Sequence, residues 1–507
     1  MAKTEQVSNL HLTRGTLLAR NIVWNLLGLI GPVAIGIFSV PRIIRGLGTD
    51  RFGILTLAWA LIGYFNFFDL GLGRALTKLV AEKLGEPEEK ETSPLFWTSL
   101  VLMLGLGIGG AILLTILSPW LVNSLLHIPV AIRKETLHAF YLLSAGLPIV
   151  ITTAGLRGFL EAHQRFGVVS GIRAFMGAFM FIAPLAVLPF SVDLSAVVAV
   201  LVLGRLVVWL LHLVFCFRTA PQLLNGLAYR KDVAKALIGF GAWMTVSNLI
   251  GPLLMYLDRF LIGIMISVAA VAYYATPYEM VTKLLLIPGA FAGVLFPAFS
   301  LRFNQDRPAT LAIMVRGTKY IYVALFPLVL VLVAFAHEGL TVWLGAAFAA
   351  NSSRVLQWLS AGVLLSGLAQ LPFAQIQGAG RPDLTAKLHL IELPCYLLGL
   401  WWLIERYGIS GAALAWVIRV ALDASLLFVL SGRLLPGGNL LAVRTALASL
   451  GASIALAVAA LTPSLTIRII FCSGILLAFT FSAWHLILTP AEKAYVWNRG
   501  KQLPAAG

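Results

Sequence analysis

The segment ALIGFGAWMTVSNLIGPLLMYLDRFLIGIMI covers residues 236–266 and carries only two charged residues, Asp258 and Arg259. About 20 apolar residues are enough for a helix to cross the hydrocarbon core of a bilayer. Ionised side chains at that depth are costly, and they persist where they pair, face a cavity or line a substrate path. The segment therefore predicts a membrane-spanning helix in a protein that moves something polar through lipid.

Segments of this kind recur along nearly the whole chain, in which 60% of the residues are hydrophobic and 11% are charged. A soluble domain needs more charge than this to cover its surface. The pattern predicts an all-α polytopic membrane protein, without the alternating segments of a membrane barrel. We expect about fourteen spans, at residues 17–40, 54–80, 95–118, 139–160, 168–190, 195–217, 236–266, 271–298, 316–336, 355–376, 385–404, 411–431, 440–461 and 466–488.

The basic residues predict the orientation of these spans. With the N-terminus in the cytoplasm, 25 of the 37 Lys and Arg residues fall in cytoplasmic segments and eight fall in segments on the other side. This bias follows the positive-inside rule, so both termini are predicted to be cytoplasmic in a multi-pass protein of the inner (plasma) membrane. The net charge of +16 then faces anionic membrane lipid, and nucleic-acid binding is not inferred from it.

A repeated motif predicts the domain organisation. Leu29-Ile30-Gly31-Pro32 recurs as Leu249-Ile250-Gly251-Pro252, each inside the first helix of a six-helix set. Parallel repeats of this kind place the substrate site between the two halves. We expect an N-terminal six-helix lobe at 1–217, a cytoplasmic connector at 218–235, a C-terminal six-helix lobe at 236–432, and two extra transmembrane helices with a cytoplasmic tail at 433–507.

Four charged residues are predicted to converge near the middle of the membrane. A turn near 267–270 would place Asp258 level with Glu279, about 15 Å deep at about 1.5 Å per residue. Arg259 could then reach Glu279, and Asp258 would lie one turn from Lys283. One interpretation is a buried ionic clamp between neighbouring helices. The convergence of four charges at one depth favours the other, an anion-binding and coupling site.

Other ionisable residues also lie inside predicted spans. Arg205 is at the midpoint of the sixth, Arg419 and Asp423 are four residues apart in the twelfth, and Glu392 follows His389 by one turn in the eleventh. Each alone is more often a satisfied contact between helices than a ligand. Their recurrence in both halves of the chain favours a polar path.

Two further features leave a functional and a structural interpretation open. Asp69, in the second predicted span, either binds an ion or caps the glycine-rich bend at Gly71 and Gly73. The three tyrosines within 273–278 either stack on sugar rings or, like most Trp and Tyr residues of the chain, anchor a span at the membrane interface.

The sequence offers no enzyme site. It lacks the phosphate-cradling GxxxxGK[ST] motif, and its three cysteines lie inside predicted spans without metal-ligand spacing. No segment outside the spans is long enough for a folded catalytic domain. These observations argue against an ATPase, a metalloenzyme and a membrane glycosyltransferase or ligase, and no cofactor or metal is expected.

Seven short motifs, in this order and spacing, resemble the polysaccharide-transport family (O-antigen or lipid-linked oligosaccharide flippases) of the multidrug/oligosaccharidyl-lipid/polysaccharide exporter superfamily. They are Ala19-Arg20-Asn21, Pro41–Gly48, Arg51–Ile54, Phe68–Gly73, Tyr256–Gly263, Gly378–Pro382 and Tyr407–Ala415. The resemblance implies two six-helix lobes in a V that open alternately to each side. The implied cargo is an undecaprenyl-diphosphate-linked oligosaccharide moved to the outer leaflet, with the polysaccharide polymerase machinery as a candidate partner.

The resemblance also implies roles for the charged residues. The cationic cavity of such flippases would map onto Arg259, Lys283, Arg205 and Arg419, with Arg42 at its outer mouth. Coupling to H⁺ or Na⁺, or pairing with these cations, would map onto Asp258, Glu279, Asp423, Glu392 and Asp69.

Two alternatives share the same fold. One is a multidrug or metabolite exporter, although the first span holds Asn21 and Asn25 and no acidic residue of the kind that subclass uses. The other is a lipid II flippase, because the two extra C-terminal spans resemble the additional helices of that group.

Overall fold

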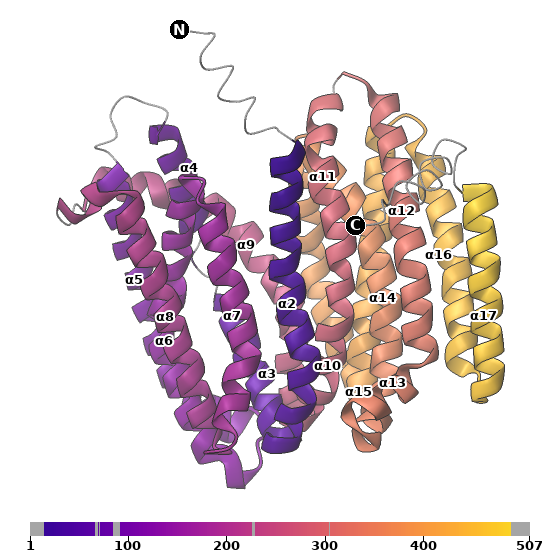
Figure 1. Ribbon diagram of the computed structural model, residues 1–507, viewed down its shortest axis with the longest axis horizontal. Helices are drawn as coiled ribbons and strands as arrows, with labels where there is room; N and C mark the ends of the chain where they lie inside the picture. The colour runs from indigo at the N-terminus through magenta and orange to yellow at the C-terminus, as the bar shows by residue number, and fades with distance from the viewer. Residues whose placement is uncertain are drawn as a thin grey trace, which may run out of the picture. The chain divides into compact units, whose positions relative to one another are not determined.

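The computed structural model describes residues 15–65, 69, 71–84, 92–225, 229–303 and 305–487 (Figure 1). Within these ranges the chain is almost entirely helical, and they contain no strand. Ten helical stretches among the described residues are long and apolar enough to cross a membrane. The all-α, polytopic architecture expected from the sequence is confirmed.

Each of the fourteen predicted spans falls on helix, but two spans are interrupted. The predicted span 54–80 is interrupted at its glycine-rich bend: α3 (Thr49–Phe65) ends before a turn that includes Asp69 and Gly71, and α4 (Leu72–Leu84) follows. The predicted span 271–298 is divided by the 3₁₀ turn Lys283–Leu285. This span contains Pro277, Pro288 and Pro297, and prolines in a membrane helix favour a bent or broken helix.

The chain packs as two compact units, residues 1–272 and 273–507. The first unit contains α3, α4, α2 (Gly15–Leu47), α5 (Thr92–Trp120), α6 (Arg133–Ala162), α7 (Phe166–Val187), α8 (Leu194–Thr219) and α9 (Lys231–Met265). The boundary between the units falls inside α10 (Val268–Thr282). The two six-helix lobes expected from the repeated motif stay a prediction, because two compact units can form without a structural repeat.

In the first unit, α6 packs against α4, α5 and α8, and α2 packs against α7. The α5–α6 contact is close because a Cβ at Gly107 would lie 2.5 Å from the Cα of Pro148. Small residues at such positions let membrane helices approach closely enough for van der Waals contact along their length. A cluster that includes Phe96, Phe159 and Leu76 fills the space among α4, α5 and α6.

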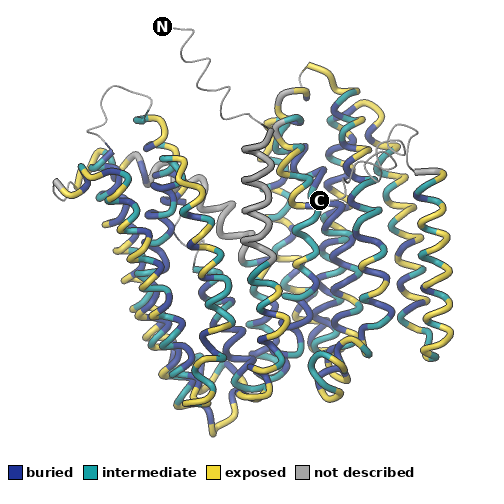
Figure 2. Tube along the Cα trace, viewed as in Figure 1, coloured by how far each residue is buried: buried dark blue, intermediate teal, exposed yellow. Residues whose placement is uncertain are grey.

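In the second unit, α14 is the central helix. It packs against α11, α12, α13 and α15. The bounds of the remaining helices are α11 Leu286–Arg302, α12 Arg307–Ala334, α13 Ala336–Leu344, α14 Ala346–Gly378, α15 Pro382–Leu434, α16 Gly438–Leu461 and α17 Leu465–Ser482. In Figure 2, α14 is mostly buried, whereas α16 and α17 are largely exposed along apolar faces. Such faces suit contact with lipid.

The helix α15 is a hairpin of two arms, corresponding to the eleventh and twelfth predicted spans. Its backbone leaves helical geometry at Gly408, where φ is 58° and ψ is −139°. Glycine adopts this positive φ without the clash that a Cβ would cause. The arms then approach so closely that a Cβ at Gly411 would lie 1.9 Å from the carbonyl oxygen of Leu403.

The C-terminal pair α16–α17 is attached to the rest of the second unit by Arg468. The guanidinium donates to Glu338 at 2.9 and 3.1 Å, to the carbonyl oxygen of Ala334 at 2.8 Å, and to those of Thr462 and Pro463 at 3.1 and 3.2 Å. This joins the start of α17 to the end of α12 and to α13.

One end of the first unit is held by a polar network around Glu135. This carboxylate accepts from Arg51 Nε at 2.7 Å and from the backbone N–H of Leu194 at 3.1 Å. Asp193 caps α8 by accepting from the N–H of Ser195 at 2.8 Å. The network joins the N-terminal ends of α3, α6 and α8.

Candidate functional site

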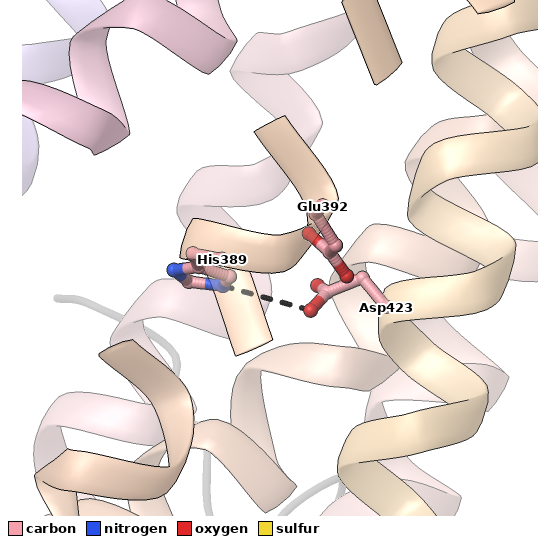
Figure 3. A group of neighbouring side chains, drawn as sticks. All are labelled: His389, Glu392 and Asp423. Carbon is pink, nitrogen blue, oxygen red and sulfur yellow. Dashed lines mark ion pairs between the residues drawn. The ribbon is translucent and has the colours of Figure 1, made fainter. Parts of the chain in front are cut away.

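The two arms of α15 bring five polar side chains together, which we call the α15 cluster: His389, Glu392, Tyr396, Arg419 and Asp423. His389 Nε2 lies 3.6 Å from Asp423 Oδ1, and Arg419 Nη1 lies 3.9 Å from Glu392 Oε2. The guanidinium of Arg419 is also 5.5 Å from the centre of the Tyr396 ring. Figure 3 shows the imidazole and both carboxyl groups pointing toward one another.

The hairpin geometry explains why these residues meet. Glu392 lies 16 residues before Gly408 and Asp423 lies 15 residues after it, so the two arms carry them at the same height. His389 and Glu392 share one face of the first arm because they are three residues apart, and Arg419 and Asp423 share a face of the second because they are four apart. Near the first arm's start, Asp383 pairs with Arg381, the residue before the helix, at 3.0 Å.

The cluster is buried and its hydrogen-bonding capacity is not filled. Only 8% of the Glu392 side chain is exposed, against 15% for Asp423 and 26% for His389. In the described part of the chain, neither carboxylate oxygen of Glu392 has a hydrogen-bond partner, nor do Asp423 Oδ1 and Arg419 Nε. Buried polar atoms in native proteins are usually satisfied, so these atoms call for a partner such as a proton, an ion or a water molecule.

The same cluster could hold a cation. One ligand atom from each of His389, Glu392 and Asp423 lies within 4.8 Å of the other two. No metal-ligand spacing is visible in the sequence, because the third group comes from the other arm of the hairpin. The neighbouring Arg419 adds a positive charge 3.9 Å from Glu392, which opposes a multivalent ion.

Asp258 and Arg259, the pair that dominates the sequence, are both buried in α9 of the first unit, with 0% and 2% exposed. Asp258 Oδ1 accepts from the backbone N–H of Arg259 at 2.8 Å. The guanidinium of Arg259 lies 5.3 Å from the centre of the Tyr256 ring. The depth of the two residues in the membrane stays a prediction.

Glu279 and Lys283 pair with each other at 2.9 Å, and both side chains are nearly half exposed. This is the i, i+4 contact expected from their spacing. The expected approach of Arg259 to Glu279 and of Asp258 to Lys283 joins residues of different packing units, so it stays a prediction.

Arg205 lies in the middle of α8 and is not paired with a carboxylate among the described residues. Its Nε atom is buried without a hydrogen-bond partner in those residues. Arg42, by contrast, is exposed and donates to the carbonyl oxygen of Phe38 at 2.6 Å.

Asp69 is buried and accepts from the backbone N–H groups of Gly71 at 3.1 Å and Gly73 at 3.0 Å. This is the capping arrangement; ion binding by Asp69 stays a prediction. Tyr274 and Tyr278 are 0% and 5% exposed and stack on each other, which leaves them no free face for a sugar ring.

Sequence reasoning missed Tyr396, and it noted His389 one turn before Glu392 without assigning it a role in the site. The spacing of His389, Glu392 and Tyr396 at successive turns of one arm was a usable signal. It needed the position of the turn at Gly408 before the second arm could be aligned with the first.

Comparisons with known proteins agree with this architecture. The family described as "Polysaccharide biosynthesis protein" matches residues 18–302. The "Putative O-antigen transporter" of Shigella flexneri is 33% identical over 413 residues, which cover 80% of this chain and 96% of that protein. The "Probable low-salt glycan biosynthesis flippase Agl15" of Haloferax volcanii is 22% identical over 75% of this chain and 76% of that protein.

Two solved structures share the fold. A lipid II flippase MurJ in an inward closed conformation has a TM-score of 0.72 at 12% identity, covering 92% of this chain and 100% of that chain. An inward-facing multidrug resistance MATE transporter of the MOP superfamily has a TM-score of 0.71 at 14% identity, covering 81% and 96%. Because the family profile matches more than half of the chain and the O-antigen transporter relative is 33% identical, the chain belongs to the family described as "Polysaccharide biosynthesis protein".

Proposed function

We propose that the protein is a flippase that moves an undecaprenyl-diphosphate-linked oligosaccharide from the cytoplasmic to the outer leaflet of the inner membrane. It would work by ion-coupled alternating access, in surface polysaccharide biosynthesis, with both termini in the cytoplasm. The observation that carries the proposal is the 33% identity to a protein named as an O-antigen transporter, along 96% of that protein's length. No step of this function requires an enzyme active site.

Arginines inside the apolar helices support an anionic cargo. Arg205 lies eleven residues into α8 and has no carboxylate partner among the described residues. A diphosphate that leaves water needs charge-assisted hydrogen bonds, and a guanidinium offers a forked pair of donors. The polyprenyl tail can stay in the bilayer while only the head group crosses. Arg205, Arg259 and Arg419 are the residues we expect to follow that head group.

The test is transport of a fluorescent undecaprenyl-diphosphate oligosaccharide in proteoliposomes. Wild-type protein should move the lipid between leaflets, and Arg205→Ala and Arg259→Ala should each slow it at least about tenfold, about 1.4 kcal/mol. Arg218→Ala is the matched control, because Arg218 is exposed at the end of the same helix as Arg205. No transport by the wild type would contradict the cargo, and equal rates in all variants would contradict the role of the arginines.

A second candidate is lipid II transport, for which a specific observation exists. The MurJ fold matches 92% of this chain against 81% for the MATE transporter, so the match extends further along the chain. The same proteoliposomes, loaded with fluorescent lipid II, separate the two cargoes. Faster movement of lipid II than of the oligosaccharide would favour this candidate.

A further inference from the structure

We infer that the α15 cluster is a proton-binding site, in which Glu392 and Asp423 share one exchangeable proton and His389 exchanges it with water. The inference rests on the proposed transport function and names the coupling ion together with the residues that hold it. Its basis is the juxtaposition of one buried and one partly buried carboxyl group, an imidazole and a guanidinium inside one helical hairpin (Figure 3).

The first step is the charge of the cluster. With a neutral imidazole, two carboxylates and one guanidinium leave a net charge of −1 in a buried place. An unbalanced buried charge is unfavourable, and two carboxylates within 4.8 Å repel each other as well. One added proton brings the charge to zero and removes the repulsion. Pairs of neighbouring carboxyl groups in proteins share a proton for this reason.

The second step is the unused hydrogen-bonding capacity. Both oxygens of Glu392 and one of Asp423 lack a hydrogen-bond partner within the described residues. A carboxylate only accepts, so two of them cannot bond to each other. When one takes up a proton, its O–H becomes a donor and the other carboxylate is the acceptor beside it. The proton thus fills a bond that the residues alone leave unmade.

The third step is the choice of a proton over a metal ion. Hard cations such as Ca²⁺ take six to eight oxygen ligands, and Mg²⁺ takes a near-octahedral set. The cluster offers two carboxyl groups and an imidazole, with the Arg419 cation 3.9 Å from Glu392. A proton needs one donor and one acceptor and tolerates the neighbouring guanidinium. A sodium ion would have to displace that guanidinium or share Glu392 with it.

The fourth step is the route. Exposure falls from 26% at His389 to 15% at Asp423 and 8% at Glu392, so the imidazole is the member closest to solvent. The ring of Phe373 on α14 stacks on the imidazole at 5.8 Å, which holds Nε2 toward Asp423. A proton from water is taken by Nε2, passes to Asp423 Oδ1 and is shared with Glu392, and the imidazole returns to its neutral form. Release follows the same atoms in reverse.

The surroundings leave the titration to these groups. Tyr396 and Arg419 are the other ionisable members, both on α15. In the second unit α15 packs against α14 and α16, and its Trp416 ring contacts the Tyr278 ring of α10 at 5.6 Å. Arg354 and Arg444 are the only charged residues in the sequences of α14 and α16, and neither forms an ion pair with the cluster in the described part of the chain. Glu279 is the charged residue of α10, and it pairs with Lys283 at 2.9 Å.

The direct test is infrared difference spectroscopy of the full-length protein in lipid vesicles during a pH titration. A protonated buried carboxyl group gives a carbonyl stretching band that shifts in D₂O. We expect this band in the wild type and its loss in both Glu392→Gln and Asp423→Asn. Asp383→Asn, which changes an exposed carboxylate at the start of the same helix, should keep it. His389→Gln should keep the band but slow the exchange of the carboxyl proton with D₂O.

A band that survives in both Glu392→Gln and Asp423→Asn, or no band in the wild type, would overturn the inference. If one of these variants does not fold, the other decides. Coupling is tested with pyranine-loaded vesicles in choline or sodium buffer: transport driven by a pH gradient without sodium supports the site. Transport driven only by a sodium gradient overturns it.

These measurements separate the two proposals. If the wild-type protein does not transport the oligosaccharide, the proposed function is wrong, and the infrared band still reports on proton binding. Transport with no titrating band would sink the proton site alone.

Discussion

Two arginine–carboxylate pairs in the second unit differ in how completely they are satisfied. Arg468 makes two bonds to Glu338 and three to backbone carbonyl oxygens, all between 2.8 and 3.2 Å. Arg419 approaches Glu392 only to 3.9 Å, and its Nε atom has no hydrogen-bond partner within the described residues. Both guanidinium groups are largely buried, with 12% and 16% exposed.

The difference distinguishes a fixed contact from a responsive one. A pair whose donors and acceptors are all used gains nothing from a ligand, and breaking it leaves buried groups stranded. A pair with unused capacity can take up a proton or an anion at small cost. The first arrangement fits attachment of one helix to another, and the second fits a transport site.

The largest expected effect tests whether the close approach of the α15 arms is what brings the cluster together. Gly411→Ala places a Cβ where 1.9 Å separates it from the carbonyl oxygen of Leu403, so the arms must separate. We expect a loss of about 3 kcal/mol in unfolding free energy. Chemical unfolding of the purified protein measures it. Gly399→Ala is the control, because nothing lies within 4 Å of its Cβ position; equal stabilities would show that the hairpin yields without strain.

The next effect tests the satisfied pair. Arg468→Ala strands Glu338 and several carbonyl oxygens, and we expect a loss of about 2 kcal/mol, reduced because Glu338 is 35% exposed. The unfolding midpoint in mild detergent reports this loss. Arg354→Ala, at an exposed position of α14, should leave the midpoint unchanged. A midpoint unmoved by Arg468→Ala would contradict the attachment role.

The unsatisfied pair should respond in the opposite way. Arg419→Ala leaves two carboxyl groups that can take up protons, so we expect a stability change below about 1 kcal/mol. Transport should fall about tenfold, about 1.4 kcal/mol, because a cationic partner is lost. Transport rates in proteoliposomes and unfolding midpoints are measured for Arg419→Ala and for Arg468→Ala, and the comparison shows whether Arg419 acts in transport or in stability. A large stability loss with normal transport would place Arg419 in the same class as Arg468.

The smallest expected effect is on the free energy of unfolding, when the helix cap Asp193 is removed. It shows how much a carboxylate outside the membrane contributes to stability. Partial burial raises the pKa of Asp193, but hydrogen bonds from Ser195 outweigh it, so the pKa lies below its usual value. The capping contribution is therefore present above the unfolded pKa, about 3.9, and is lost as pH falls through the lower folded pKa. Asp193→Ala should cost about 1 kcal/mol at pH 7. The difference from wild type should shrink below about pH 4; a constant difference would rule out the ionised cap.

Most of the fold could be predicted because long apolar segments in lipid have one stable form, the helix. The bend in the span 54–80 was expected from its glycines, but the sequence left two roles open for Asp69, because a hydropathy pattern does not register the two backbone N–H groups that donate to this carboxylate. The hairpin at Gly408 was predicted as a boundary between spans, although not as a close approach of its arms.

The site was harder to predict because it depends on which residues share a height. Counting from the turn near 267–270 aligned Asp258 with Glu279. The same count from Gly408 aligns Glu392 with Asp423 and Tyr396 with Arg419, and it brings His389 into the group. The direction in which each side chain points, and the unused oxygens of Glu392, follow from packing that the sequence does not state.

The five bonds of Arg468 have a consequence for shortened or recombined forms of the protein. A chain ending after α15 would lose α16 and α17, and it would also uncover an acceptor set on Glu338 and Ala334 that only a buried cation had filled. The last two helices therefore carry, in Arg468, the cation that binds them to α12 and α13. Moving them onto a twelve-helix relative should succeed only where that relative supplies a carboxylate and a free carbonyl at the receiving corner.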